Sequence, residues 1–176
     1  MLFAELLRRE FHTVLGLIAA RIEQDPAVAL PGRLVPEVFL EQVRWPLARA
    51  ILTSDGDVLG ALAMTADGHP VARQLGFHSL LARLVNVWRE HALLVAETSA
   101  ADQVCMIDAV LAGFFSGGIA VPEGQGPSPE HRADLLGRVI KGAVEPSATP
   151  TEATVRAAAR DVVSALADAR SELAGG

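Results

Sequence analysis

Prolines and glycines divide this sequence into segments whose apolar residues recur at the spacing of an α-helix. That spacing gathers them on one helical face, whereas a half-buried β-strand would show an apolar residue at every second position. No segment shows a sustained alternation of the second kind, and Tyr, a residue enriched in strands, is absent. We therefore predict an all-α fold, a bundle of about six to seven helices in a single domain over residues 1–176.

The N-terminal half is predicted to contain three helices. The first covers about residues 2–24 and has one apolar stripe, so one of its faces should be buried. The second covers about residues 35–52 and has Pro36 in its first turn, where a proline is tolerated. Pro46 lies inside this helix, and because an interior proline removes a backbone hydrogen bond, we expect a kink or the helix end there, next to a cavity. A short helix at residues 58–63 is expected to follow.

Capping signals mark the helices of the C-terminal half. Ser99 and Asp102 resemble a capping box, with Asp in place of the usual Glu or Gln. Ser128-Pro129-Glu130 provides a cap, a first-turn proline and an acid near the positive end of the helix dipole, and Thr149-Pro150-Thr151-Glu152 repeats the arrangement. The expected helices cover about residues 72–94, 100–116 and 129–145, and a last helix is opened by residues 149–152.

Several stretches carry a family resemblance through their order and spacing. Leu2-Phe3-Ala4-Glu5-Leu6-Leu7 opens the chain inside a helix, with no capping Ser, Thr, Asp or Asn before it. The others are residues 46–55 with 58–60, residues 88–94, in which Ala92 stands where the pattern has Gly, residues 107–114 and residues 132–136. Together they resemble the effector-binding and dimerisation domain of TetR-family transcriptional regulators.

This resemblance implies a homodimer that binds a small hydrophobic effector. It also implies a three-helix DNA-binding domain ahead of residue 2, which is absent here, either because this is a stand-alone effector domain or because its start is placed too late. The net charge of −6 and the scattered arginines form no basic stripe that could bind duplex DNA. DNA binding is therefore expected only through the missing N-terminal domain.

Other classes of protein and site find no support in the sequence. The single cysteine, Cys105, cannot form a disulfide within the chain, and there is neither a secretory signal nor an apolar run long enough to span a bilayer, so we expect a cytoplasmic protein with no membrane association. Its histidines lie on separate segments without the spacing of metal ligands, and no nucleophile motif or phosphate-binding loop is present. We expect no metal, no cofactor and no enzymatic activity.

The predicted helix at residues 100–116 is apolar on nearly every side and needs burial partners on two faces. Either it is the central helix of a monomeric bundle, or one face lines the core while the other joins residues 129–145 in a two-fold interface between two copies. The family resemblance favours the second interpretation, in which Gly137 and Gly142 permit close approach. The expected interface residues are Ile107, Leu111, Phe114, Leu136, Val139, Ile140 and Ala143.

An apolar pocket is predicted between the kinked second helix and the central helices. Apolar pockets between the helices of a bundle are common ligand sites, and Met adapts to varied shapes. The alternative is that the same side chains form only the core. The residues expected to bind the ligand are Phe39, Trp45, Leu62, Met64, Phe77, Leu81, Trp88, Met106 and Val110.

The sequence therefore favours the ligand-sensing and dimerisation domain of a TetR-like transcriptional regulator, in which an effector would change the spacing of two DNA-reading heads. One alternative is a headless interaction protein that pairs with a full-length regulator and leaves it with a single DNA-reading head. Another is an unrelated helical bundle with a structural or enzymatic role.

Overall fold

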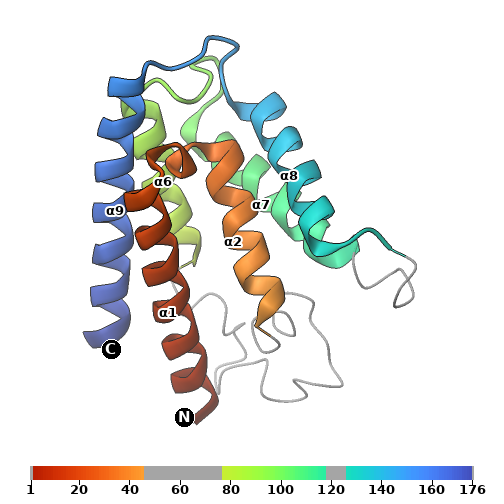
Figure 1. Ribbon diagram of the computed structural model, residues 1–176, viewed down its shortest axis with the longest axis vertical. Helices are drawn as coiled ribbons and strands as arrows, with labels where there is room; N and C mark the ends of the chain where they lie inside the picture. Colours follow the sequence, from red (N-terminus) through yellow and green to blue (C-terminus); the bar gives the residue numbers. More distant parts are fainter. Residues whose placement is uncertain (1, 46–76, 118–125, 176) are drawn as a thin grey trace.

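The computed structural model describes residues 2–45, 77–117 and 126–175 (Figure 1). In these ranges the chain forms six α-helices and one short 3-10 helix and contains no strand, which confirms the all-α prediction. No helix in these ranges has the length and apolar character needed to cross a membrane. The elements are α1 (Leu2–Gln24), η1 (Pro26–Ala29), α2 (Pro31–Arg44), α6 (Phe77–Glu90), α7 (Ala100–Gly117), α8 (Pro129–Val144) and α9 (Glu152–Gly175).

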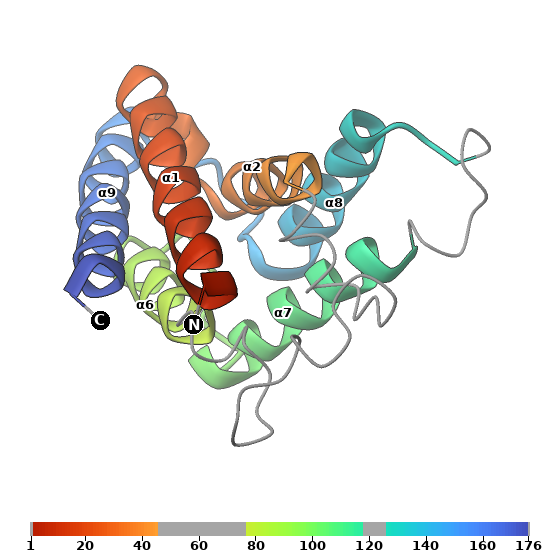
Figure 2. The same ribbon diagram turned by 90° about the horizontal axis from the view of Figure 1, so that it is seen from below.

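Four helices form an arc, and two more lie along one side of it. α9, α1, α2 and α8 follow one another around the arc, and α6 and α7 cover its side, as the two perpendicular views show (Figures 1 and 2). Within the arc α1 packs mainly on α9 and α2 mainly on α8, while α6 contacts both α9 and α7. The hydrophobic core fills the space that these helices enclose.

The core is continuous and receives side chains from all six described α-helices. The ring of Phe39 on α2 lies 5.1 Å from that of Phe115 and meets Phe114 edge-on, with centroids 6.4 Å apart. The guanidinium carbon of Arg132 lies 5.2 Å from the centroid of the Phe39 ring, a cation–π contact. The largest fully buried apolar side chains are Trp88, Phe39, Ile18, Ile22, Leu34, Ile107, Leu136, Ile140 and Leu166.

A buried amide fixes the connection between α6 and α7. Gln103 is fully buried, and its Nε2 donates to the carbonyl of Val95 (2.7 Å) while its Oε1 accepts from Arg89 (2.8 Å). The same Arg89 nitrogen donates to the carbonyl of Thr98 at 2.7 Å. The N–H of Val95 in turn donates to the carbonyl of Val144 (2.9 Å), which ties the connection to the end of α8. Every polar group of this buried amide is therefore matched by the chain itself.

The second helix differs from its predicted bounds at both ends. It begins at Pro31, one turn before the expected start, so that Pro31 rather than Pro36 occupies the first turn and Pro36 lies inside the helix. It ends at Arg44, with Trp45 as its C-cap, in agreement with the expectation that it ends or kinks at Pro46. The continuation to residue 52 and the short helix at residues 58–63 lie outside the described residues.

The other helices follow the sequence pattern more closely. α1 has its predicted bounds, and α7 and α8 differ from theirs by a single residue at the C-terminal end. The predicted caps of α7 and α8 are present, because Ser99 Oγ accepts from Asp102 N (3.1 Å) and Ser128 Oγ accepts from His131 N (3.2 Å). The cap of α9 is Thr151, whose Oγ1 accepts from Thr154 N at 3.2 Å, and not Thr149.

α6 ends four residues before the predicted boundary, in a Schellman turn. Ala92 has φ = 53°, the left-handed conformation that normally requires Gly. The N–H of Leu93 donates to the carbonyl of Trp88 (2.8 Å), and that of Ala92 donates to the carbonyl of Arg89 (3.0 Å). The resemblance noted from the sequence has Gly at this position, and the backbone geometry gives the physical reason for that preference.

α2 and α8 cross at two glycines. A Cβ atom placed on Gly137 would lie 2.7 Å from the carbonyl oxygen of Gly32 and 3.1 Å from Cγ of Pro36. Pro36 has no N–H, so it leaves the Gly32 carbonyl without its usual partner in the helix. The missing side chain of Gly137 allows the α8 backbone to come close to that carbonyl. Gly137 therefore permits a close approach between α8 and α2 of the same chain, whereas the sequence pattern predicted it between two copies.

Candidate apolar ligand site

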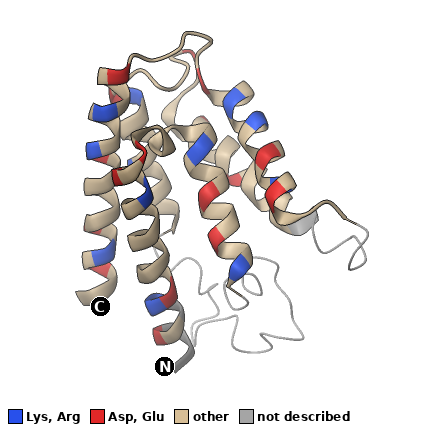
Figure 3. Cartoon of the chain, in the orientation of Figure 1, with Lys and Arg blue, Asp and Glu red and all other residues tan. Residues whose placement is uncertain are grey.

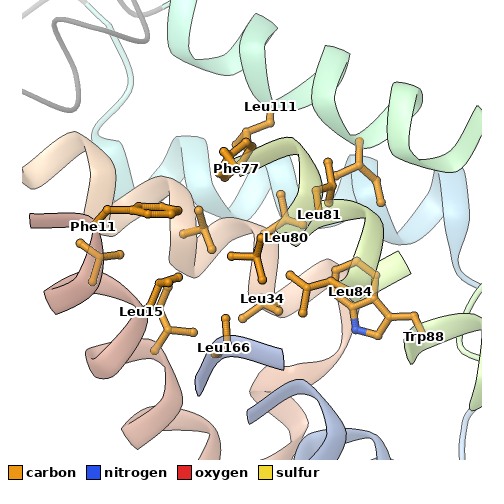
Figure 4. Close-up of a pocket in the computed structure, with 15 residues that line it drawn as sticks. Phe11, Leu15, Leu34, Phe77, Leu80, Leu81, Leu84, Trp88, Leu111 and Leu166 are labelled. Carbon is orange, nitrogen blue, oxygen red and sulfur yellow. The ribbon is translucent and has the colours of Figure 1, made fainter. Parts of the chain in front are cut away.

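An apolar cavity lies where α1, α2, α6, α7 and α9 meet (Figure 4). Its volume is about 30 Å³. Among the described residues, each side chain that lines it is apolar, so this part of the lining offers shape and dispersion contacts and no polar recognition. The lining residues are Phe11, Val14, Leu15, Ile18, Leu34, Val35, Val38, Phe77, Leu80, Leu81, Leu84, Trp88, Ile107, Leu111 and Leu166.

Helical periodicity explains why these side chains converge. The α1 residues Phe11, Val14, Leu15 and Ile18 fall on one stripe, and α6 presents a similar stripe from Phe77 onward. The two stripes face each other across the cavity in the close-up view, and the rings of Phe11 and Phe77 are 6.3 Å apart (Figure 4). The cavity is the space that remains between these two stripes and the other three helices.

Trp88 forms one wall of the cavity and is also a structural residue. It is fully buried, and its Nε1 donates to the carbonyl of Ala29 in η1 at 2.8 Å. The indole N–H is therefore already bonded, so a ligand would meet only the apolar ring.

The structure brings together three of the nine residues predicted to bind a ligand. Phe77, Leu81 and Trp88 line the cavity. Phe39 is fully buried but packs against α7 and α8, and Trp45 is only partly buried at the end of α2; neither lines the cavity. Met106 is 36% exposed and Val110 is partly buried, and neither lines the cavity. Leu62 and Met64 lie outside the described residues.

The α1 wall of the cavity was not predicted. Its apolar stripe indicates burial, but periodicity does not say which neighbouring helix a stripe meets. The same holds for Ile107 and Leu111, which were expected at a dimer interface and instead line the cavity.

Four of the seven predicted interface residues lie in the interior of the single chain. Ile107, Leu136 and Ile140 are fully buried, and Leu111 is 4% exposed. In the described conformation they have no surface to offer to a second copy, because α7 and α8 pack on each other and α8 packs on α2. Phe114 and Ala143 are partly buried, and Val139 is 43% exposed.

The outer face of α7 is apolar although it is exposed. Asp102 and Asp108 are its only charged residues, and the exposed residues after them are small. By contrast the exposed residues of α9 include many charged ones, as is usual for a face that meets water. The exposed residues of α7 are Ala101, Asp102, Cys105, Met106, Asp108, Ala109, Ala112 and Gly113, and the exposed charged residues of α9 are Glu152, Arg156, Arg160, Asp161, Asp168 and Glu172.

Charged side chains do not form a nucleic-acid site on the face shown in Figure 3. Both signs of charge occur on the visible helices, and the basic residues form no continuous stripe there. The largest charged cluster joins α1 to α2: Glu41 is buried and bonds to Arg21 at 2.5 Å and to Arg44 at 2.9 Å. Among the described residues, no group of three His, Cys, Asp or Glu side chains is placed to hold a metal ion.

Comparison with known proteins gives no relative. No family model, no curated protein and no solved structure matches this chain. The site geometry is therefore the basis for any function proposed.

Proposed function

We propose that this chain is a ligand-sensing and dimerisation domain that binds a small apolar effector, as in a TetR-like transcriptional regulator. The observation that carries the proposal is a cavity at the meeting point of five helices, whose described lining residues are all apolar. The apolar groove between bundle helices is a usual place for a ligand of this kind. The order of the sequence motifs supports the assignment to a regulator.

The size of the cavity determines how it would work. Drug-sized ligands occupy pockets of roughly 300–1,000 Å³, so a cavity of about 30 Å³ must widen to accept one. Widening requires at least one of the surrounding helices to move. The ligand then binds an open conformation more tightly than the closed one, which is the requirement for a ligand to shift a conformational equilibrium.

α1 is the helix that would transmit this conformational change to a neighbouring domain. It supplies Phe11, Val14, Leu15 and Ile18 to the cavity. In a complete regulator the DNA-binding domain would precede this helix. A displacement of α1 would therefore change the spacing of two DNA-reading heads in a dimer.

The first experiment is a cavity-filling comparison. Val14→Leu adds one methylene to a residue that lines the cavity, whereas Val85→Leu adds it to a fully buried residue outside the cavity. We expect Val14→Leu to keep or raise the melting temperature of the free protein and to weaken the binding of benzene, toluene and n-octanol. Val85→Leu should lower the melting temperature, because extra volume in a packed core costs about 1–3 kcal/mol.

Binding is measured by thermal shift and by the fluorescence of Trp88 in a Trp45→Phe background. A ligand present at one hundred times its dissociation constant stabilises the native state by about 2.7 kcal/mol. A parent protein that shows neither a shift nor a change in fluorescence with any probe would contradict the proposal.

We also propose that the domain is a homodimer, formed by the exposed face of α7 together with the exposed face of α8. Met106 and Val139 are large apolar side chains left exposed on these two helices. The C-terminal half of α8 exposes Arg138 and Lys141, and the α7 face exposes Asp108, so a two-fold pairing that brings these parts together would match opposite charges.

A matched pair of variants tests the dimer. Val139→Arg places a charge on the proposed interface, whereas Leu17→Arg places it on α1, at a residue of similar exposure. Light scattering should show a dimer for the parent and for Leu17→Arg, and a monomer for Val139→Arg, because an unpaired charge would be buried. A monomeric parent protein at micromolar concentration would overturn this proposal and leave the cavity proposal intact. Leu136 and Ile140, although expected at the interface, are core residues and therefore do not suit this test.

A further inference from the structure

A groove lies at the C-terminal end of α1, where this helix and η1 meet α9. α1 and α9 run side by side in opposite directions, so the last turn of α1 lies against the first half of α9 (Figure 1). The volume of this α1–α9 groove is about 540 Å³. That volume is within the range of roughly 300–1,000 Å³ found for small-molecule sites. Unlike the apolar cavity, the groove therefore needs no movement of the helices to admit a ligand.

The inner lining of the α1–α9 groove is apolar. Ile22 on α1, Pro26 in η1, and Ala159 and Val163 on α9 contribute to it. Ala159 and Val163 are one helical turn apart and so lie on the same face of α9. Ile22 and Ala159 are buried, whereas Pro26 and Val163 are partly exposed. The groove thus offers apolar surface to the side chains of a ligand.

Two opposite charges line the same groove from different helices. Glu23 lies in the last turn of α1 and Arg160 lies on α9, and both are exposed. Among the described residues neither of them forms an ion pair, with the other or with a third group. An exposed charge needs no partner, so neither residue alone indicates a site. Their common position on an apolar groove is the observation that does.

The neighbouring charges are already matched within the chain. Arg156, which also lines the groove, pairs with Glu152 one turn away. Asp25, just after α1, pairs with Arg33 at 2.9 Å. The charges left for a ligand are therefore one carboxylate, from α1, and one guanidinium, from α9.

We propose that the α1–α9 groove binds a short apolar peptide with free termini, whose ammonium group faces Glu23 and whose carboxylate faces Arg160. A guanidinium binds a carboxylate through two parallel N–H donors. The C-terminal end of a helix carries partial negative charge, which also favours the ammonium group beside Glu23. The apolar side chains of the peptide would contact the apolar lining.

The separation of the two charges favours a peptide over a single amino acid. Glu23 and Arg160 belong to different helices and are not in contact with each other. A ligand that reaches both must therefore carry its own charges apart, as a peptide does at its two ends. This site is separate from the apolar cavity and does not rest on the function proposed for it.

The test compares the dipeptide Leu-Leu with its N-acetylated, C-amidated and doubly capped forms and with free leucine. We expect Leu-Leu to bind about fivefold more tightly than either singly capped form, the size expected for one partly exposed ion pair. Free leucine should bind more weakly than Leu-Leu. Binding is measured by calorimetry at about pH 6, where both termini are charged, and at low salt, where screening is least.

Two variants assign each terminus to its partner. In Glu23→Gln acetylation should no longer weaken binding, and in Arg160→Gln amidation should no longer do so. The controls are Glu97→Gln and Arg9→Gln, at exposed residues that do not line the groove, and both should keep the behaviour of the parent.

A second pair of variants tests the apolar lining. Val163→Thr places a hydroxyl in the groove and should weaken all four Leu-Leu forms about equally. Val155→Thr makes the same change at a partly buried residue of α9 that does not line the groove, and should leave the affinities unchanged. Equal effects of the two substitutions would contradict binding in this groove.

The remaining outcomes each decide one part of the proposal. Equal affinities for the four Leu-Leu forms would overturn the zwitterionic ligand class, and tighter binding of free leucine would overturn the peptide. A preference that survives both Glu23→Gln and Arg160→Gln would overturn the assignment of the charges. Absence of binding by any of these probes at millimolar concentration would overturn the site, while the binding of n-octanol tests the apolar cavity separately.

Discussion

The backbone of Gly137 on α8 lies against the carbonyl of Gly32 on α2, so closely that a Cβ atom on Gly137 would be 2.7 Å from that oxygen. A real Cβ contact is almost never so short, and the obstacle is backbone rather than a flexible side chain. The packing of α8 on α2 at this crossing therefore depends on the absence of a single methyl group.

Gly137→Ala should destabilise the protein by roughly 1–3 kcal/mol, because α2 and α8 must separate to admit the methyl group. Gly142→Ala is the matched control on the same helix, where a Cβ would meet nothing within 4 Å. It should stabilise the fold by roughly 0.5–1 kcal/mol through helix propensity. Urea denaturation measures both changes. Similar effects of the two substitutions would contradict the claim that the contact between Gly137 and Gly32 limits how closely α2 and α8 pack.

Ala92→Gly should stabilise the protein. The Schellman turn holds Ala92 at φ = 53°, which costs an L-residue about 1 kcal/mol and costs Gly nothing. We expect a net gain of only several tenths to 1 kcal/mol, because the larger entropy of Gly in the unfolded chain offsets part of the relieved strain. Thermal and urea unfolding would reveal it, and Ala101→Gly, inside α7, serves as the opposite control and should destabilise.

Trp88→Phe should lower stability without removing ligand binding. The substitution deletes the indole N–H and leaves the buried carbonyl of Ala29 without its donor, at about 1–3 kcal/mol. An aromatic ring still lines the cavity, so apolar probes should bind at least as well in the larger space. Trp88→Ala is less informative because truncation of a fully buried Trp costs about 3–5 kcal/mol. Loss of binding in folded Trp88→Phe would contradict the apolar role of this wall.

The stability contribution of Glu10 should depend on pH. Burial raises the pKa of its carboxyl above the ordinary value of 4.5. The folded state then holds the proton more tightly than the unfolded state, so this contribution to the free energy of unfolding is lost as pH rises from about 4.5 through the raised pKa. Relative to the parent, Glu10→Gln should gain stability across that window and change little below it. Urea unfolding of the parent and of Glu10→Gln at several pH values checks the sign.

The chain by itself should not bind duplex DNA with sequence specificity. Its net charge is −6, and both signs of charge occur on the helices visible in Figure 3. Gel retardation with operator-like and random fragments should show at most weak, salt-sensitive binding. A specific complex that survives physiological salt would contradict the expectation.

The sequence predicts the helices better than it predicts how they pack. Apolar spacing locates α1, and side-chain caps locate α7 and α8, because these signals lie within a few residues of each other along the chain. The start of α2 was placed one turn late because two prolines, Pro31 and Pro36, both fit a first turn. Local rules do not choose between these two prolines. In the folded chain α8 packs at Gly137 against the Gly32 carbonyl that Pro36 leaves without its helical partner, and this packing accommodates Pro36 inside the helix.

The candidate site was predicted only in part for a related reason. Leu136 and Ile140 are apolar enough for either a core or an interface, and the pattern does not say whether the covering surface belongs to the same chain. Phe77, Leu81 and Trp88 line the cavity, but their partners on α1 were not predicted, because contacts between distant helices depend on the packing of the whole bundle. For the same reason the sequence does not show that Glu23 and Arg160 line one groove.

Because α1 is long, a small tilt of this helix at the cavity produces a larger displacement at its N-terminal end. The helix is held at its C-terminal half by the buried Ile18 and Ile22 and by the Arg21 ion pairs, while its first residues extend about three turns beyond Phe11. If a ligand tilts α1 about this anchored part by about 5°, the first turn swings by roughly 2 Å, since each residue adds 1.5 Å to the lever arm. A small tilt of α1 at the cavity would thus become a larger displacement at its N-terminal end.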